Sequence, residues 1–210
     1  MRKKSLWIFL TVLIIVAVSA IFLFLQSSSP EHSVKQFFKS FKTQDKESMR
    51  HVYPADILSI EQNSLEAAVA SGIDAAIEQE SATARKYDST AIVSEAQKKI
   101  LDFKYDIKSS KVSGNQASVV VEITAYELGS AYREWYLESK QIKFSGEGSS
   151  GRKNIALRLN LLEQKFKESP KTYKSVFEIK LIKKHGDWLI SDMGDSYEFL
   201  RAVSGAFIYS

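Results

Sequence analysis

Histidines are the residues of this chain best suited to acid–base or metal chemistry near neutral pH, and there are three, His32, His51 and His185. No two of them are four residues apart, the spacing that places two imidazoles on one helix face as metal ligands, and the chain contains no cysteine. We therefore predict neither a metal centre nor a bound cofactor. His51 lies close to Tyr53 in the sequence and stays a candidate acid or base, whereas we expect His185 in an exposed turn.

Two carboxylate pairs have spacings that could share a proton or bind a cation. Asp74 and Glu78 are four residues apart, and Asp192 and Asp195 are three apart. Neither pair has a third ligand group nearby or the loop spacing of a calcium site. We interpret them as solvated surface residues and helix caps.

A glycine motif, Gly146-x-Gly148-x-x-Gly151, has the letters of a dinucleotide-binding fingerprint. That fingerprint requires a preceding buried parallel strand and a surrounding βαβ unit, and the sequence predicts neither. We interpret residues 145–151 as a flexible loop, because serine and glycine dominate them.

Aromatic residues offer a possible pocket. Tyr126, Trp135 and Trp188 could line a cavity together with His51, although aromatic residues at helical spacing usually pack into a core, which is our first interpretation. Tyr132 and Tyr136, which flank Trp135 at helical spacing, are read in the same way.

The segment 165–184 is rich in lysine and could contact anionic lipid headgroups or wall polymers. Glutamates are interspersed, so the alternative is a solvated sheet edge on which lysines discourage edge-to-edge pairing. The candidate surface contacts are Lys165, Lys167, Lys171, Lys174, Lys183 and Lys184.

Residues 6–25 form an unbroken, almost entirely apolar run. If this run spans a membrane, all of these candidate residues lie outside it. Twenty residues of helix span about 30 Å, the thickness of a bilayer's hydrocarbon core. Arg2, Lys3 and Lys4 precede the run, and the first 26 residues contain no acid, so we expect the N-terminus on the cytoplasmic side. The alternative is a signal peptide cleaved near Ala20, but the apolar run exceeds the usual signal core of about 7–15 residues.

We predict a cytoplasmic tail and transmembrane anchor at 1–26, a linker at 27–32 and an exported domain at 33–210. Three of the 29 basic residues precede the anchor, so the remainder has 26 basic residues against 25 acidic ones, and nothing indicates nucleic-acid binding. The absence of cysteine excludes both disulfides and lipid attachment at cysteine, which suits a protein of the bacterial cell membrane.

Hydrophobic periodicity predicts an α+β domain. Val34, Phe37, Phe38 and Phe41 recur at helical spacing after Ser33, a candidate cap. Alternating residues predict two β-hairpins, over 103–125 and 173–190. Further helices are expected at 46–52, 65–77, 90–101, 128–136, 155–166 and 195–207. Helices that alternate with hairpins in this order favour an antiparallel sheet packed on helices.

The segment 183–190, with its Lys-x-x-Gly-x-Trp-x-Ile pattern, follows a long charged strand and a leading amphipathic helix. This layout resembles the exported domains of the nuclear-transport-factor-2-like (cystatin-like) superfamily. The resemblance implies a curved antiparallel sheet that wraps around helices as a cone with a pocket. The helices between Leu128 and Ser169 make the link between the hairpins longer than the minimal pattern. Cones of this kind serve as enzymes, binding modules and assembly factors, so the resemblance does not fix a function.

Three functions remain open. The first is a single-pass membrane protein whose exported domain binds a ligand or an envelope protein partner, or acts in assembly, without catalysis. The second is an enzyme or small-ligand binder with His51, Asp56 or Asp192 buried in a polar cavity. The third is a module whose lysines bind anionic polymers or lipid.

Overall fold

The computed structural model describes residues 29–53, 69–70, 73, 89–141, 149–193 and 196–208. Within these ranges no helix combines the length and the apolar character needed to cross a bilayer. The apolar run at 6–25 lies outside the described residues, as do Asp56, Asp74, Glu78 and Asp195.

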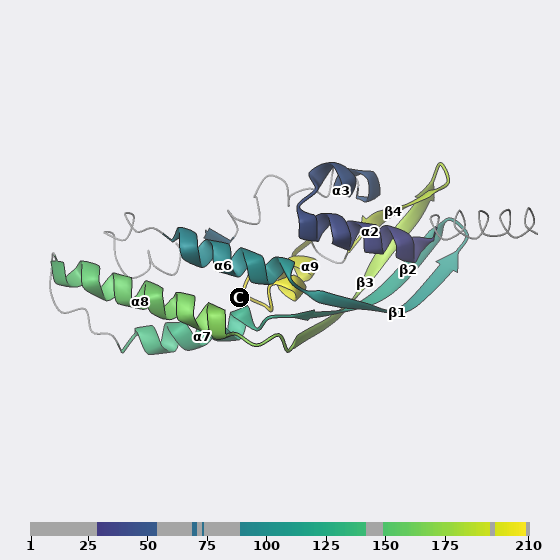
Figure 1. Cartoon of the computed structure of the whole chain (residues 1–210). Coiled ribbons are helices and arrows are strands. Elements are labelled where there is room, and N and C mark those ends of the chain that lie inside the picture. The colour runs from purple at the N-terminus through teal and green to yellow at the C-terminus, as the bar shows by residue number, and fades with distance from the viewer. Residues whose placement is uncertain are drawn as a thin grey trace, which may run out of the picture.

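A curved four-stranded antiparallel sheet forms one half of the molecule (Figure 1). Its strands are β1 (Lys104–Ser113), β2 (Gln116–Ala125), β3 (Tyr173–Lys184) and β4 (Asp187–Asp192), and they lie side by side in sequence order. Both predicted hairpins are therefore confirmed. The alternation of apolar and polar residues directs the apolar side chains to one face of the sheet, because successive side chains of a strand point to opposite faces.

Helices α2 (Pro30–Thr43) and α9 (Ser196–Val203) cover that apolar face (Figure 1). Phe38 of α2 lies between Phe103 and Phe199, with ring centroids 5.6 and 5.9 Å away. All three rings are fully buried. Aromatic side chains thus fill the space between helices and sheet, as the spacing of the phenylalanines predicted.

The leading helix starts earlier than we predicted. Ser29, not Ser33, is its N-cap, and the Ser29 hydroxyl accepts a hydrogen bond from the His32 amide at 3.2 Å. Pro30 occupies the first turn, where its missing N–H costs nothing. Ser33 is buried on the helix, and residues 30–32, which we assigned to the linker, are helical.

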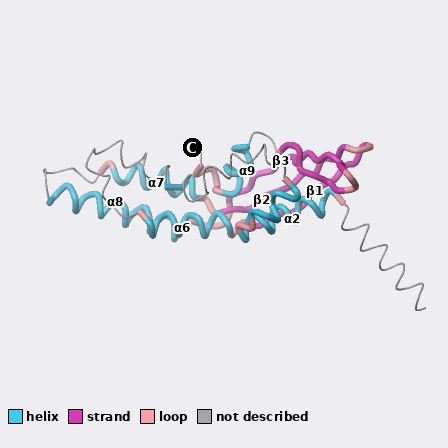
Figure 2. Tube along the Cα trace, turned by 90° about the horizontal axis from the view of Figure 1, so that it is seen from above, coloured by secondary structure: helices cyan, strands magenta, loops and turns pink. Residues whose placement is uncertain are grey.

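Three further helices continue the molecule away from the sheet (Figure 2). They are α6 (Thr90–Leu101), α7 (Leu128–Ser139) and α8 (Ser149–Glu168), and α8 packs against both of the others. A short helix, α3 (Lys46–Val52), follows α2. The predictions for 46–52, 90–101 and 128–136 are confirmed.

Three other helix predictions need correction or completion. Residues 149–151 belong to α8 and not to a loop, because a helix gains one hydrogen bond for each residue added once it is nucleated. The last helix ends at Val203, since Gly205 and Ala206 adopt left-handed backbone conformations. Of the helix expected at 65–77, the described residues Val69, Ala70 and Ile73 are helical.

Candidate functional site

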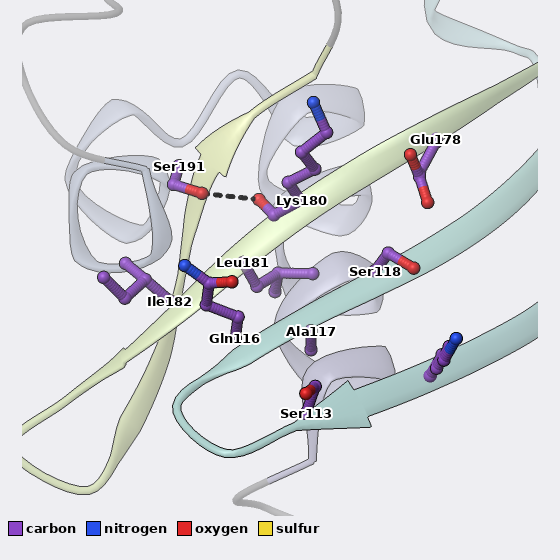
Figure 3. A pocket seen from close by; sticks show the side chains of 10 residues that line it. Ser113, Gln116, Ala117, Ser118, Glu178, Lys180, Leu181, Ile182 and Ser191 are labelled. Carbon is purple, nitrogen blue, oxygen red and sulfur yellow. Dashed lines mark hydrogen bonds between the residues drawn. The ribbon is translucent and has the colours of Figure 1, made fainter.

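The face of the sheet opposite α2 and α9 carries a hollow of about 300 Å³ near the hairpin turns (Figure 3). The register brings Lys111 of β1, Ser118 of β2 and Lys180 of β3 into one row across the sheet. Ser113, Gln116 and Ile182 form the next row, one step closer to the turns. The other lining residues are Ala117, Glu178, Leu181 and Ser191.

Two irregularities in strand pairing shape this hollow. The register of β1 against β2 shifts between Ile107 and Ser109, and this shift turns the odd-numbered residues that follow, Lys111 among them, to the open face. The register of β3 against β4 shifts between Lys180 and Leu181. Ser191 of β4 is the extra residue at this shift and lies beside β3. The Ser191 hydroxyl donates a hydrogen bond to the Lys180 carbonyl oxygen at 3.1 Å (Figure 3).

The lining combines hydroxyl, amide and charged groups that can donate or accept hydrogen bonds. The Lys180 ammonium contacts the Asp192 carboxylate at 3.0 Å, and this hydrogen bond raises the pKa of Lys180, so it remains protonated. Ser113 and Ser118 bring hydroxyls, but no imidazole lies among the lining residues to activate them as nucleophiles. The arrangement can hold a polar group through hydrogen bonds.

The four predicted pocket residues lie on separate elements and do not line this hollow. His51 is exposed in the last turn of α3. Trp135 is buried between α7 and α8, where its indole N–H donates to the Arg158 carbonyl oxygen at 2.7 Å. Trp188 is buried in β4 and lies under the Lys183 ammonium, which is 5.5 Å from the ring centroid. A ligand role for these residues stays a prediction.

Tyr126, the fourth, lies just after β2, where the sheet meets the helices. It belongs to a cluster of polar side chains, the Tyr126 cluster, with Lys99, Asp102 and Lys171. Its ring has the ammonium groups of Lys99 and Lys171 at 4.2 and 4.8 Å from its centroid, and its hydroxyl donates to Asp102 at 3.0 Å. Burial raises the pKa of Tyr126, and the hydrogen bond to Asp102 adds to that rise. The hydrogen bond from Lys171 lowers the pKa of the Asp102 carboxyl.

Lys99 connects the Tyr126 cluster to α8 through hydrogen bonds. The lysine is buried, and its ammonium donates to the carbonyl oxygens of Lys167 and Ser169 at 2.9 and 3.3 Å, at the C-terminus of α8. A cation at this end of a helix satisfies free carbonyls and complements the helix dipole. Burial lowers the pKa of Lys99. We interpret the polar side chains of the Tyr126 cluster as structural, because their contacts connect the sheet to the helices.

The six predicted surface lysines do not form one stripe. Lys165 and Lys167 lie on α8, whereas Lys174, Lys183 and Lys184 lie on β3. Four of the six contact carboxylates: Lys165 with Glu138 at 2.5 Å, Lys167 with Glu163 at 2.5 Å, Lys171 with Asp102 at 2.5 Å and Lys174 with Glu122 at 3.7 Å. Lys183 and Lys184 are exposed at the turn between β3 and β4.

Sequence reasoning missed the residues that line the hollow. Ser118 and Gln116 alternate with buried residues in β2, so their position on the outer face could have been inferred. Lys111 gave no such signal, because the register shift that directs it there depends on strand pairing. Asp192, a sequence candidate, lies beside the hollow through its contact with Lys180.

No protein-family model matches the chain, and no curated protein matches it. Among solved structures, the chain is similar to that of YcdA, a candidate lipoprotein of Bacillus subtilis, with 17% sequence identity and a TM-score of 0.48. The match covers 73% of this chain and 49% of the YcdA chain, so this chain spans about half the length of that protein.

Proposed function

We propose that this protein is a single-pass membrane protein whose α+β domain lies outside the cell and binds a partner or ligand without catalysis, through the hollow on the open face of its sheet. The apolar run at 6–25 and the basic residues before it support the location. Alkaline carbonate should leave the full-length chain in the membrane pellet. Release of the intact chain would contradict a transmembrane anchor.

One observation carries the binding role. Aromatic rings fill the space between the sheet and its covering helices, and the described cavity is on the outer face. A hollow of about 300 Å³ with several hydrogen-bonding groups matches the lower end of small-ligand sites. The same lining could hold polar side chains of a protein partner.

A photo-reactive phenylalanine analogue at Ser118 tests this role in cells. The analogue should form specific adducts there, and Gln116→Trp, which fills the hollow, should abolish them. The matched control carries the analogue at Lys98, an exposed residue on α6. Equal adducts from both positions, or adducts that persist in the Gln116→Trp variant, would contradict binding in the hollow.

The enzyme alternative has less support. It requires a catalytic group in a polar cavity, yet His51 is exposed and Asp192 has a side chain that is 41% exposed and paired with Lys180. The third alternative, a lysine stripe over 165–184, is weakened by the carboxylates that contact four of its six lysines.

A further inference from the structure

The orientation of α2 fixes which end of the domain is next to the proposed anchor. At its start, the Glu31 side chain lies near the Ser110 side chain of β1, which helps to lower the pKa of Glu31. Near its end, the Lys42 ammonium donates to the Phe103 carbonyl oxygen, just before β1, at 2.5 Å. The helix therefore runs antiparallel to β1, and its N-terminus lies at the end of the sheet where β1 turns into β2 (Figure 1).

Both hairpin turns lie at this same end. Gln116 of β2 pairs with Ile182 of β3, and the Lys183 amide donates to the Asn115 carbonyl oxygen at 2.8 Å. The turn at Gly114 and Asn115 is thus directly beside the turn at His185 and Gly186. We call these two turns, with residues 111–116 and 183–187, the hairpin tips.

The chain leaves little distance between the hairpin tips and the membrane. From Leu25, the end of the apolar run, to Pro30, the start of α2, there are five Cα steps, which span at most roughly 17 Å. From Ser110, beside the α2 N-terminus, to Gly114 at the turn, β1 extends about 13 Å. The hairpin tips can therefore reach the membrane surface while the anchor is in place.

The hairpin tips have the chemistry of a surface that contacts anionic lipid. Lys111, Lys183 and Lys184 are exposed there, and Asp187 is the acid between residues 183 and 187. Val112, the next residue of β1, is 54% exposed and presents an apolar side chain on the other face of the same hairpin tip. Lysines near a membrane surface are attracted by anionic headgroups, and neighbouring apolar side chains favour the interface.

We infer that the hairpin tips dock on anionic phospholipid headgroups beside the anchor and so hold the domain in a fixed orientation on the membrane. This inference rests on the proposed anchor. Each lysine at an anionic surface contributes about a fivefold preference for the docked state. Docking places the hollow, which begins at Ser113 and Gln116, close to the lipid surface.

Site-specific quenching in vesicles tests this inference. The chain has no cysteine, so Asn115→Cys and Gln141→Cys each accept one fluorophore, at a hairpin tip and just after α7, at the opposite end. The full-length chain is placed in phosphatidylcholine vesicles with about 30% phosphatidylglycerol and a small fraction of lipid bearing a nitroxide on its headgroup. We expect strong quenching at position 115 and weak quenching at 141. Omitting phosphatidylglycerol or raising the salt should reduce quenching at 115, because salt screens exposed charges.

A charge variant separates the effect of the lysines at the hairpin tips from any effect of the hollow. Lys183→Gln with Lys184→Gln leaves Lys111, which lines the hollow, in place and should reduce the docked-to-undocked ratio about 25-fold. Lys98→Gln with Lys140→Gln makes the same change of charge on exposed residues away from the hairpin tips and should leave quenching at 115 unchanged.

The possible outcomes distinguish failure of the docking from failure of the proposed anchor. Vesicle flotation in pure phosphatidylcholine tests the anchor alone, and failure of the chain to float overturns both the anchor and the docking that rests on it. A chain that floats but shows equal quenching at positions 115 and 141 overturns the docking only. Quenching at 115 that is insensitive to phosphatidylglycerol, or equally reduced by both charge variants, also overturns it.

Discussion

Replacing Gly205 with alanine should destabilise the domain far more than the same change at Gly114. Both glycines have left-handed backbones, with φ of 58° and 61°, so the backbone strain of alanine, about 1–2 kcal/mol, is shared. A Cβ at Gly114 would meet no atom within 4 Å, whereas a Cβ at Gly205 would lie 1.8 Å from the Tyr126 carbonyl oxygen. Backbone must move to relieve that overlap, at a further cost of about 1–3 kcal/mol or more.

The overlap would also strain the contact between Gly205 and α7, where the Gly129 amide donates to the Gly205 carbonyl oxygen at 3.0 Å. For a domain of this length, about 1 kcal/mol lowers Tm by about 2–4 °C. We expect Gly114→Ala to lower Tm by a few degrees and Gly205→Ala by about 10 °C, measured by circular dichroism on the full-length chain in mild detergent. Equal shifts for the two variants would refute the close backbone approach at Gly205.

Three further outcomes follow from buried and paired groups. Lys99→Met should cost about 1.5–3 kcal/mol in urea unfolding, because two carbonyl oxygens lose a charged donor, whereas Lys98→Met at an exposed site should cost under about 0.5 kcal/mol. Among the described residues the buried Tyr53 hydroxyl has no hydrogen-bond partner, and burial raises the pKa of Tyr53 to about 12. Tyr53→Phe should therefore leave stability equal or higher and flatten its decline above about pH 10. Tyr126→Phe, which loses a bond to Asp102, should cost about 1 kcal/mol. Because the Asp102 pKa is lowered in the folded state, its contribution is present above about pH 4 and is lost as pH falls, so Asp102→Asn should make acid unfolding less steep; an unchanged profile would contradict the pairing.

The sequence was most informative where one face of an element is buried. Val119, Val121 and Ile123 alternate with polar residues, and this period alone predicted β2 and its buried face. The same reasoning predicted α6 with both ends correct. The start of α2 was missed because Ser29 and Ser33 are both acceptable caps, and the choice depends on burial of Ser33.

The candidate site was much less predictable than the fold. Lys111 reaches the hollow through a register shift in β1, and such a shift depends on how two strands pair rather than on local residue preference. The aromatic candidates Trp135 and Trp188 turned out to be buried, in line with the first interpretation of them as packing residues. The burial of Lys99 was not predicted, since only the approach of α8 gives its ammonium buried partners.

Cysteine labelling in intact cells tests the central claim, an anchored domain whose hollow is open to the outside. The chain lacks cysteine, so Ser118→Cys provides one thiol in the hollow and Ser5→Cys provides one before the apolar run. A membrane-impermeant maleimide should label position 118 in intact cells and position 5 only after the cells are opened. Labelling of position 5 in intact cells, or protection of position 118 until lysis, would contradict the proposed topology.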